Sequence, residues 1–490
     1  MPSHTNQSHH RNRAVGAVIA SACGDALGAP YEFKPSLPDS TLVVLKAGGG
    51  WGLGEWTDDT SMAMPILHAA ARRLNFGDDA TLGALVRAWL TWSTDAKDVG
   101  IQTRKVLDRV RRAAGDAVSD AALAELARTA AREVHDSTGR SGGNGSLMRT
   151  GPLALAYLED PRGLAAAARA VSDLTHVEED AGDACVIWSL AIRQVIITGE
   201  LDIRGPIDTL PANRRERWHA RIDVAESLEP RDIPGSNGWV VAALQAAWSA
   251  IVRGDGLVDT LERAVRCGND TDTVAAIAGA LAGARHGVSA IPFAWQRRLH
   301  GWPGWGYDDL VGFASLAFNS GRADISADLD AGFVGSGVAT EREVRGIVRH
   351  PVVRHPHDAG VWLGDLRALD TLPEGVDAVV SLSRVGVSDA SAVRRSDRAV
   401  IWILDSDDNL DVDGALRHAA DAVAVLRSER RVVLLHCVEA HSRTPTVAAA
   451  YAVRHLGIDA EKALADVLVA LPGANPRVAF REALLRVAPS

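Results

Sequence analysis

Two clusters of acidic and hydroxyl side chains stand far apart in the chain and have the composition of a metal-binding site. The first is Thr57-Asp58-Asp59, and the second is Asp270-Thr271-Asp272-Thr273. Hard divalent cations prefer oxygen ligands, and crowded carboxylates repel one another unless a cation neutralises them. We therefore expect the two clusters to meet around two divalent cations. Mg²⁺ or Mn²⁺ suits such a set of oxygens better than zinc, which prefers His and Cys.

Helix capping is the alternative interpretation of each cluster taken alone. Each cluster directly precedes a run that is compatible with a helix, residues 62–74 in the first case and 274–284 in the second. Acidic and hydroxyl side chains at such positions accept hydrogen bonds from free backbone N–H groups. The presence of two clusters favours the metal site, because two helix N-termini directed at one point would bring four carboxylates together.

A different chemistry is indicated near the C-terminus, where Cys437 is followed by Arg443. A loop between a strand and a helix can direct several backbone N–H groups at an anion, and a cysteine thiolate there is a nucleophile. Arg443 can bind two phosphate oxygens, and Thr444 can donate a hydrogen bond to the sulfur. Asp405 follows an upstream strand and could protonate a leaving oxygen, with Asp407 as a second candidate.

The elements that must position the acid clusters are predicted to be helices. Apolar residues recur at helical spacing over 181–195 and 240–251, and residues 120–133 form an amphipathic pattern with Ser119 as a cap. Glycine-rich loops separate such segments. We predict an all-α domain over residues 13–325, preceded by a disordered tail over residues 1–12.

The pattern changes after a Gly-, Asp- and Ser-rich stretch that we interpret as a linker over residues 326–344. Short buried strands are predicted at 376–382, 399–404 and 432–435, and helices at 415–426 and 446–455. Strands that alternate with helices are typical of a largely parallel sheet. We therefore predict an α/β domain over residues 345–490.

Composition excludes several classes of partner. The 490 residues carry a net charge of −10, which argues against a broad nucleic-acid-binding surface. We found neither the apolar core of a signal peptide nor an uninterrupted apolar run of about 20 residues that would span a bilayer. The four cysteines form no C-x-x-C pair. We expect a cytoplasmic protein without nucleic-acid or membrane partners.

Five motifs, in this order, resemble those of the ADP-ribosylglycohydrolases over about residues 13–320. They are GDALGAPYEF at 24–33, WTDDT at 56–60, GNGSLMR at 143–149, TH at 175–176 and GNDTDT at 268–273. The resemblance implies an all-helical fold with a binuclear Mg²⁺ or Mn²⁺ site. It also implies a hydrolase that releases ADP-ribose from an ADP-ribosylated protein or an ADP-ribose-containing metabolite.

The same resemblance implies roles for individual residues. The implied metal ligands are Thr57, Asp58, Asp59, Asp270, Asp272 and Thr273. The residues implied to bind substrate are Gly143, Asn144, Gly145, Ser146 and His176. Glu32 is implied to contact metal or substrate, and Asp98 to line the cleft, although Asp98 could instead cap a helix. Asp58, Asp59 and Glu32 are the candidates for orienting the attacking water.

The C-terminal part resembles the cysteine-dependent tyrosine phosphatases of the small dual-specificity type. This resemblance implies Cys437 as nucleophile, Arg443 as phosphate binder and Asp405 as general acid acting on a phosphorylated substrate. That family usually has glycine where this chain has Ala440, and alanine disfavours a positive φ. The prediction is thus a bifunctional hydrolase. Two alternatives remain: a glycohydrolase fused to an inactive phosphatase-like domain, or a non-catalytic sensor of ADP-ribose or phosphate.

Overall fold

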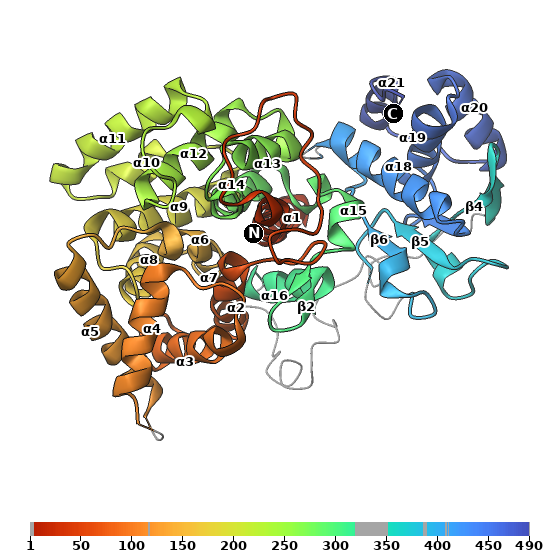
Figure 1. Cartoon of the computed structure of the whole chain (residues 1–490). Coiled ribbons are helices and arrows are strands. Elements are labelled where there is room, and N and C mark those ends of the chain that lie inside the picture. The colour runs from red at the N-terminus through yellow and green to blue at the C-terminus, as the bar shows by residue number, and fades with distance from the viewer. Residues whose placement is uncertain are drawn as a thin grey trace. The chain divides into compact units, whose positions relative to one another are not determined.

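The computed structural model describes residues 4–115, 118–318, 351–385, 390–406, 409 and 411–489, and these form two compact units (Figure 1). The first unit runs up to Gly287 and resumes at Arg298. The second unit takes Val288–Arg297 together with the described residues from 351 onward. This differs from our predicted boundary, which assigned Val288–Arg297 to the helical domain. The predicted linker over 326–344 and the candidate acid Asp407 lie outside the described residues.

The first unit is built largely from helices, as the sequence predicted. Its longer helices are α1 (His4–Gly28), α2 (Asp58–Ala71), α3 (Asp79–Asp95), α4 (Ile101–Ala113), α5 (Asp120–Thr138), α8 (Pro161–Asp173), α9 (Glu179–Thr198), α11 (Ala212–Ser227), α12 (Val240–Arg253), α13 (Gly256–Arg266), α14 (Thr271–His286) and α16 (Tyr307–Phe318). The short elements are α6 (Leu147–Thr150), α7 (Leu153–Ala156), α10 (Arg204–Asp208), β1 (His300–Gly301) and β2 (Trp305–Gly306). The predicted cap of α5 is confirmed, because the Ser119 hydroxyl accepts a hydrogen bond from the Ala122 N–H.

Helix α1 begins earlier than predicted. We expected a disordered tail over residues 1–12, yet the helix starts at His4, and Asn12 is buried. The Arg11 guanidinium lies 5.6 Å from the centre of the Phe318 ring on α16. The polar composition of this segment suggested solvent exposure, but residues 8–11 are half-buried and Asn12 is buried.

Helices α1 and α14 pack closely against each other at the centre of the first unit. A Cβ at Gly24 of α1 would lie 2.2 Å from the Ala275 carbonyl oxygen, and a Cβ at Gly279 of α14 would lie 2.3 Å from the Ala20 carbonyl oxygen. Glycines on both helices therefore let the backbones touch. At Gly28, where α1 ends, the Thr271 hydroxyl donates to the glycine carbonyl at 3.0 Å. The end of α1 thus lies beside the start of α14.

Two helical segments, Ser8–Tyr31 and Glu179–Thr198, are long and apolar enough to cross a membrane by length and composition. Neither segment was expected from the sequence as a membrane span, because polar residues interrupt both. Their apolar stretches are 94% and 78% buried within the structure, which is the burial of core helices.

The second unit contains a five-stranded sheet in the order β3-β4-β7-β5-β6. Its strands are β3 (Val353–His355), β4 (Asp358–Gly364), β5 (Ala378–Ser381), β6 (Arg398–Val400) and β7 (Val433–His436). Its helices are α15 (Phe293–Gln296), α18 (Val412–Ser428), α19 (Arg443–Leu456), α20 (Ala460–Ala470) and α21 (Val478–Leu485). Only β3 pairs antiparallel, with β4, so the sheet is mixed but mainly parallel. Cys437 follows the central strand β7.

Candidate active site

The start of α2 is held by an acid from another helix. Asp25 of α1 is fully buried and accepts hydrogen bonds from the backbone N–H groups of Thr57 and Thr60, each at 2.9 Å. Thr57 is the N-cap residue of α2, but its own side chain makes no capping hydrogen bond. Asp25 therefore satisfies the free N–H groups of α2 and fixes the turn that carries Asp58 and Asp59.

The two predicted acid clusters meet in space. Carboxylate oxygens of Asp25, Asp59 and Asp272 lie within 4.8 Å of one another, and so do those of Glu32, Asp270 and Asp272. Asp272 belongs to both groups. Asp25 was not among our predicted site residues, although it is the single acid in the apolar stretch Ala14–Gly28, and a buried acid in such a stretch indicates a specific polar role.

Glu32 and Asp270 are brought together by a pair of backbone hydrogen bonds. The Phe33 N–H donates to the Asn269 carbonyl at 2.7 Å, and the Asn269 N–H donates to the Lys34 carbonyl at 2.7 Å. Phe33 and Asn269 both have φ +58°. Left-handed non-glycine residues of this kind cluster at functional sites, where the surrounding structure holds them.

Burial raises the pKa of every carboxyl group in these two triads and of Asp58. Burial is the main cause, and neighbouring carboxylates add to it for most of them. The pKa of Glu32 is raised to about 8 by burial and then by Asp270. The pKa of Asp58 is raised to about 7 by burial and then by Asp98. Burial raises the pKa of Asp25 to about 6, even though its hydrogen bonds to Thr57 and Thr60 oppose the rise.

These residues fit divalent cations that prefer oxygen ligands. Within the described residues, no ion pair joins Asp25, Glu32, Asp58, Asp59, Asp270 or Asp272 to a lysine, arginine or histidine. The Asp59 Oδ1 atom is buried and has no hydrogen-bond partner in the described part of the chain. A buried carboxylate oxygen without a partner is costly unless a cation binds it. Thr57 lies beside this oxygen set, because its hydroxyl donates to Asp59 Oδ2 at 3.1 Å.

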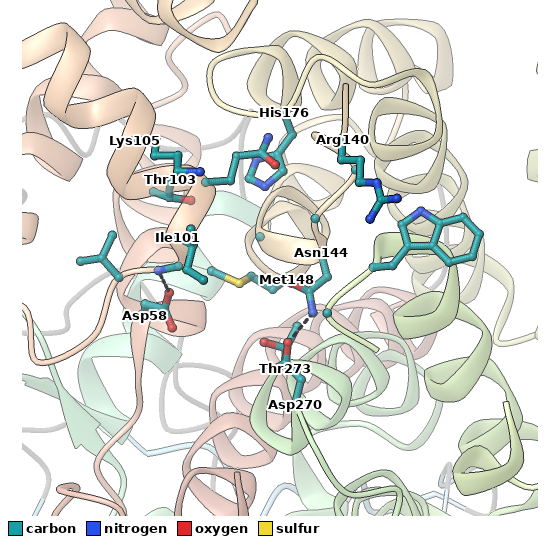
Figure 2. A pocket seen from close by; sticks show the side chains of 18 of the residues that line it. Asp58, Ile101, Thr103, Lys105, Arg140, Asn144, Met148, His176, Asp270 and Thr273 are labelled. Atoms are coloured by element: carbon teal, nitrogen blue, oxygen red, sulfur yellow. Dashed lines mark hydrogen bonds between the residues drawn. The ribbon is translucent and has the colours of Figure 1, made fainter. Parts of the chain in front are cut away.

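The acids open into a cavity of about 680 Å³. Its acidic side is lined by Glu32, Asp58, Asp98, Asp270, Asp272 and Thr273. Figure 2 shows Asp58 and Asp270 on one side of the cavity and His176 on the other. Asp25, Thr57 and Asp59 are not part of the lining and lie buried behind it. The clusters thus present one layer of oxygens to the cavity and a second layer beneath.

The predicted loop also lines the cavity, through Gly143, Asn144 and Gly145. The Asn144 side-chain amide donates to Asp270 Oδ2 at 2.8 Å, which ties the loop to the acids (Figure 2). Ser146 does not line the cavity, contrary to our prediction. It is fully buried, and its hydroxyl accepts a hydrogen bond from Ser172, because it points into the helix packing beneath the loop.

Asp98 lines the cavity, and the helix-cap alternative has no support. The N-cap residue of α4 is Gly100, whereas Asp98 Oδ1 accepts a hydrogen bond from the adjacent Val99 N–H at 2.8 Å. The Gly100 N–H donates instead to Asp58 Oδ2 at 3.2 Å. Asp58 thereby links the start of α2 to the start of α4.

In the second unit, Cys437 is buried at the carboxyl end of β7, and α19 begins at Arg443. The Arg443 guanidinium is buried, and its Nη1 donates to the carbonyls of Leu382 and Ile403, which follow neighbouring strands. The Thr444 hydroxyl is within 3.5 Å of the Gly364 carbonyl oxygen, to which it donates, rather than to the sulfur as we predicted.

Two further features describe the cysteine loop, residues 437–442. Ala440 has φ +54°, so the loop adopts the left-handed conformation at the position where we expected alanine to resist it. Asp405 accepts a hydrogen bond from Arg477 Nε at 2.9 Å. The Arg477 N–H in turn donates to Ser442 Oγ at 3.1 Å, so Arg477 connects the predicted acid to the loop.

Comparison with known proteins covers both units. A family model described as ADP-ribosylglycohydrolase matches residues 6–325. The ADP-ribosylarginine hydrolase Tri1 of Pseudomonas putida (strain GB-1) is 30% identical over 299 residues, which are 59% of this chain and 74% of the relative. The ADP-ribosyl-dinitrogen reductase glycohydrolase of Rhodospirillum rubrum is 30% identical over 301 residues, which are 60% of this chain and 92% of the relative.

For the second unit, the crystal structure of human DUSP28 aligns with 29% of this chain and 96% of its own chain. The sequence identity is 23% and the TM-score is 0.26.

Proposed function

Because the chain belongs to the ADP-ribosylglycohydrolase family through residues 6–325, we propose that its first unit uses two divalent cations to remove ADP-ribose from arginine side chains of proteins. Relatives that are 30% and 29% identical are ADP-ribosylarginine hydrolases, which supports the arginine linkage. The observation that carries the proposal is the meeting of two distant acid clusters at one cavity. Two triads that share Asp272 suit two cations.

The acidic residues of the two layers would bind different cations. Asp59 and Asp272 would hold one cation in the buried layer, and Glu32, Asp270 and Asp272 would hold the other at the cavity. Bound Mg²⁺ or Mn²⁺ would position the ribose hydroxyls and lower the pKa of a bound water. The loop at Gly143–Gly145 and His176, which line the same cavity as the acids, would bind the diphosphate and ribose.

Cleavage breaks the bond between ribose C1″ and the guanidinium nitrogen of the acceptor. Positive charge develops on the sugar as this bond lengthens, and the cavity carboxylates stabilise it. Glu32 and Asp58 face the cavity, whereas Asp59 lies behind it, so we propose Glu32 or Asp58 as the residue that orients the attacking water. The bonding electrons leave with the arginine nitrogen, so the arginine departs as a neutral guanidine that takes up a proton from solvent. The water adds to C1″, and its proton passes to that carboxylate.

The test is release of ADP-ribose from a protein carrying arginine-linked ADP-ribose. We expect release with Mg²⁺ or Mn²⁺, none after chelation, and none in Asp58→Asn with its circular dichroism unchanged. Asp39→Asn removes an exposed acid outside the cavity and serves as the matched control. Activity on serine-linked but not arginine-linked protein would overturn the linkage, and release unaffected by both chelation and Asp58→Asn would overturn the proposal itself.

A second activity, in the second unit, is favoured by a buried cysteine at the end of a central strand, next to the N-terminus of a 14-residue helix. We propose that Cys437 Sγ attacks the phosphorus of a phosphomonoester. The phosphorus–oxygen bond breaks, and Asp405 gives a proton to the leaving oxygen. Water then hydrolyses the cysteinyl phosphate and releases inorganic phosphate.

Hydrolysis of an aryl phosphate by the full chain tests this second activity. We expect turnover in the wild type, no turnover in Cys437→Ser, and retained phosphate binding in that variant. Phosphate binding without turnover in the wild type would support the inactive phosphatase-like alternative, and absence of both would remove the second activity.

A further inference from the structure

A buried arginine directly follows the cavity-lining residue Met148, and within the described part of the chain no ion pair joins this arginine to an acid. Arg149 of α6 is fully buried, and its guanidinium lies 4.1 Å from the centre of the Trp89 ring. Its Nη1 is 3.7 Å from Met62 Sδ, on α2. Its Nη2 donates to the Thr175 hydroxyl at 2.7 Å and to the Val171 carbonyl at 3.3 Å. Neither the metal site nor the cavity lining accounts for this residue.

The hydrogen-bond chain continues from Thr175 to His176. The Thr175 hydroxyl oxygen lies 2.7 Å from His176 Nδ1, and both residues are buried. A guanidinium can only donate, so the Thr175 oxygen accepts from Arg149. The hydroxyl hydrogen then has His176 Nδ1 as its acceptor among the contacts of Thr175. If Nδ1 carried the proton instead, the hydroxyl hydrogen would be buried without an acceptor, which is unfavourable.

We infer that Arg149 and Thr175 are positioning residues that hold His176 in the tautomer with its proton on Nε2. His176 is then a fixed neutral donor. Burial first, and the Arg149 charge second, lower the pKa of His176 to about 3, so the ring is uncharged at neutral pH.

The Nε2 atom faces the glycine loop. A Cβ at Gly143 would lie 3.3 Å from His176 Nε2, and a Cβ at Gly145 would lie 3.2 Å from His176 Cε1. His176 lines the cavity beside these glycines (Figure 2). The donor is thus available to an acceptor oxygen of the ligand, a diphosphate or ribose oxygen of ADP-ribose. This part of the inference rests on the proposed function, whereas the tautomer does not.

Long-range ¹H–¹⁵N correlation spectra of the full-length protein test the tautomer directly, with the His176 signal assigned by its loss in His176→Gln. Nε2 couples to both ring hydrogens, whereas Nδ1 couples strongly to one. We expect the protonated nitrogen of His176 to be the one that couples to both. A proton on Nδ1 in the wild type would overturn the inference, whatever the activity of the protein.

Two variants then separate positioning from packing. Thr175→Val keeps the shape of the side chain but removes the hydroxyl, and Thr175→Ser keeps the hydroxyl. We expect Thr175→Val to lose the Nε2–H signature and to bind ADP-ribose about ten-fold more weakly, and Thr175→Ser to retain both. Equal affinity of Thr175→Val and wild type would remove the role in binding. Failure of the wild type to bind ADP-ribose would instead count against the proposed function.

Discussion

Asp272 connects the two acidic triads, because its carboxylate belongs to both. Burial raises its pKa well above the usual range, and Asp59 and then Asp270 add to the rise. A folded chain that holds such groups without cations keeps protons that the unfolded chain releases. Protons and cations therefore compete for the same oxygens.

Mn²⁺ affinity should therefore weaken as the pH falls from 8 to 6. The pKa of about 8 at Glu32, a proposed cation ligand, means that this carboxyl group is largely protonated at the lower pH. Its proton must leave before the oxygen binds a cation, so we expect a loss of at least about ten-fold. Isothermal titration calorimetry in buffers of different ionisation enthalpy measures both the affinity and the protons released. Asp39→Asn should behave as wild type, and a pH-independent affinity would contradict the prediction.

The same groups determine how metal-free stability depends on pH. A carboxyl whose folded-state pKa is raised binds more protons in the folded chain than in the unfolded chain. The free energy of unfolding of the metal-free protein should then fall as the pH rises from about 4 through about 8. Urea unfolding in the presence of a chelator measures this slope, and a rise over the same range would show that other groups dominate.

At the scale of elements, the contact between α1 and α14 brings the acids together. Glycines on both helices permit this approach, and Gly28 lies where the start of α14 meets the end of α1. A Cβ at Gly28 would lie 2.5 Å from Asp272 Cα, which is too close for any side chain. The position of Asp272 therefore depends on a glycine in another helix.

Gly28→Ala should lower both stability and cation affinity. The added methyl group clashes with backbone, which cannot rotate away, so we expect a destabilisation of about 2–3 kcal/mol and at least ten-fold weaker Mn²⁺ binding, roughly as for other overpacked sites. Thermal unfolding and calorimetry measure the two effects. Gly115→Ala is the control, because its Cβ would meet no atom within 4 Å. A Gly28→Ala protein that binds Mn²⁺ normally would contradict the proposed dependence.

The loop between β7 and α19 has an alanine, Ala440, at a position whose backbone conformation favours glycine. Ala440 is fully buried with φ +54°, a conformation that costs an alanine roughly 1 kcal/mol. The buried surroundings of the loop must therefore compensate for this strain.

Ala440→Gly should stabilise the second unit by up to about 1 kcal/mol, since glycine adopts this φ freely but loses more entropy on folding. Hydrogen exchange of the peptides around α19 measures the local effect. Ala448→Gly, within α19, provides a matched comparison that should destabilise instead. Loss of protection in Ala440→Gly would show that the Ala440 methyl group stabilises the loop more than the strain costs.

At the scale of the molecule, the chain forms two units, each with its own core. Val288–Arg297 precedes the end of the first unit in the sequence but belongs to the second. Phe293 is buried in the core of the second unit, and Arg297 pairs with Glu429 at 2.7 Å. The second unit is therefore incomplete without a segment that lies within the family match, near its C-terminal end.

Phe293→Ala should destabilise the second unit selectively, by about 3 kcal/mol, because it removes a large side chain from the core. Hydrogen-exchange mass spectrometry of the full chain should show faster exchange in α18 and its neighbouring strands and no change in α1 or α14. Faster exchange of α1 and α14 as well would contradict the assignment of this segment to the second unit alone.

Sequence alone was enough to predict the largely helical first unit, the alternating strands and helices of the second, and most of the acids at the cavity. Amphipathic periodicity reports which face of an element is buried, and the threonine–aspartate motifs contain the oxygens that a cation needs. Such local signals predicted α5, α9, α12 and β7 near their observed positions.

Tertiary structure decided what those buried faces pack against. Asp25 caps α2, although it lies 32 residues before Thr57 in the chain. Ser146 is buried in the helix packing beneath the loop and does not line the cavity. Phe293 belongs to the second unit, although the residues on either side of its segment in the sequence belong to the first. Periodicity carries no information about a partner that is distant in the chain. These three positions depend on buried hydrogen bonds and on apolar core packing, which exist only once the whole unit has folded.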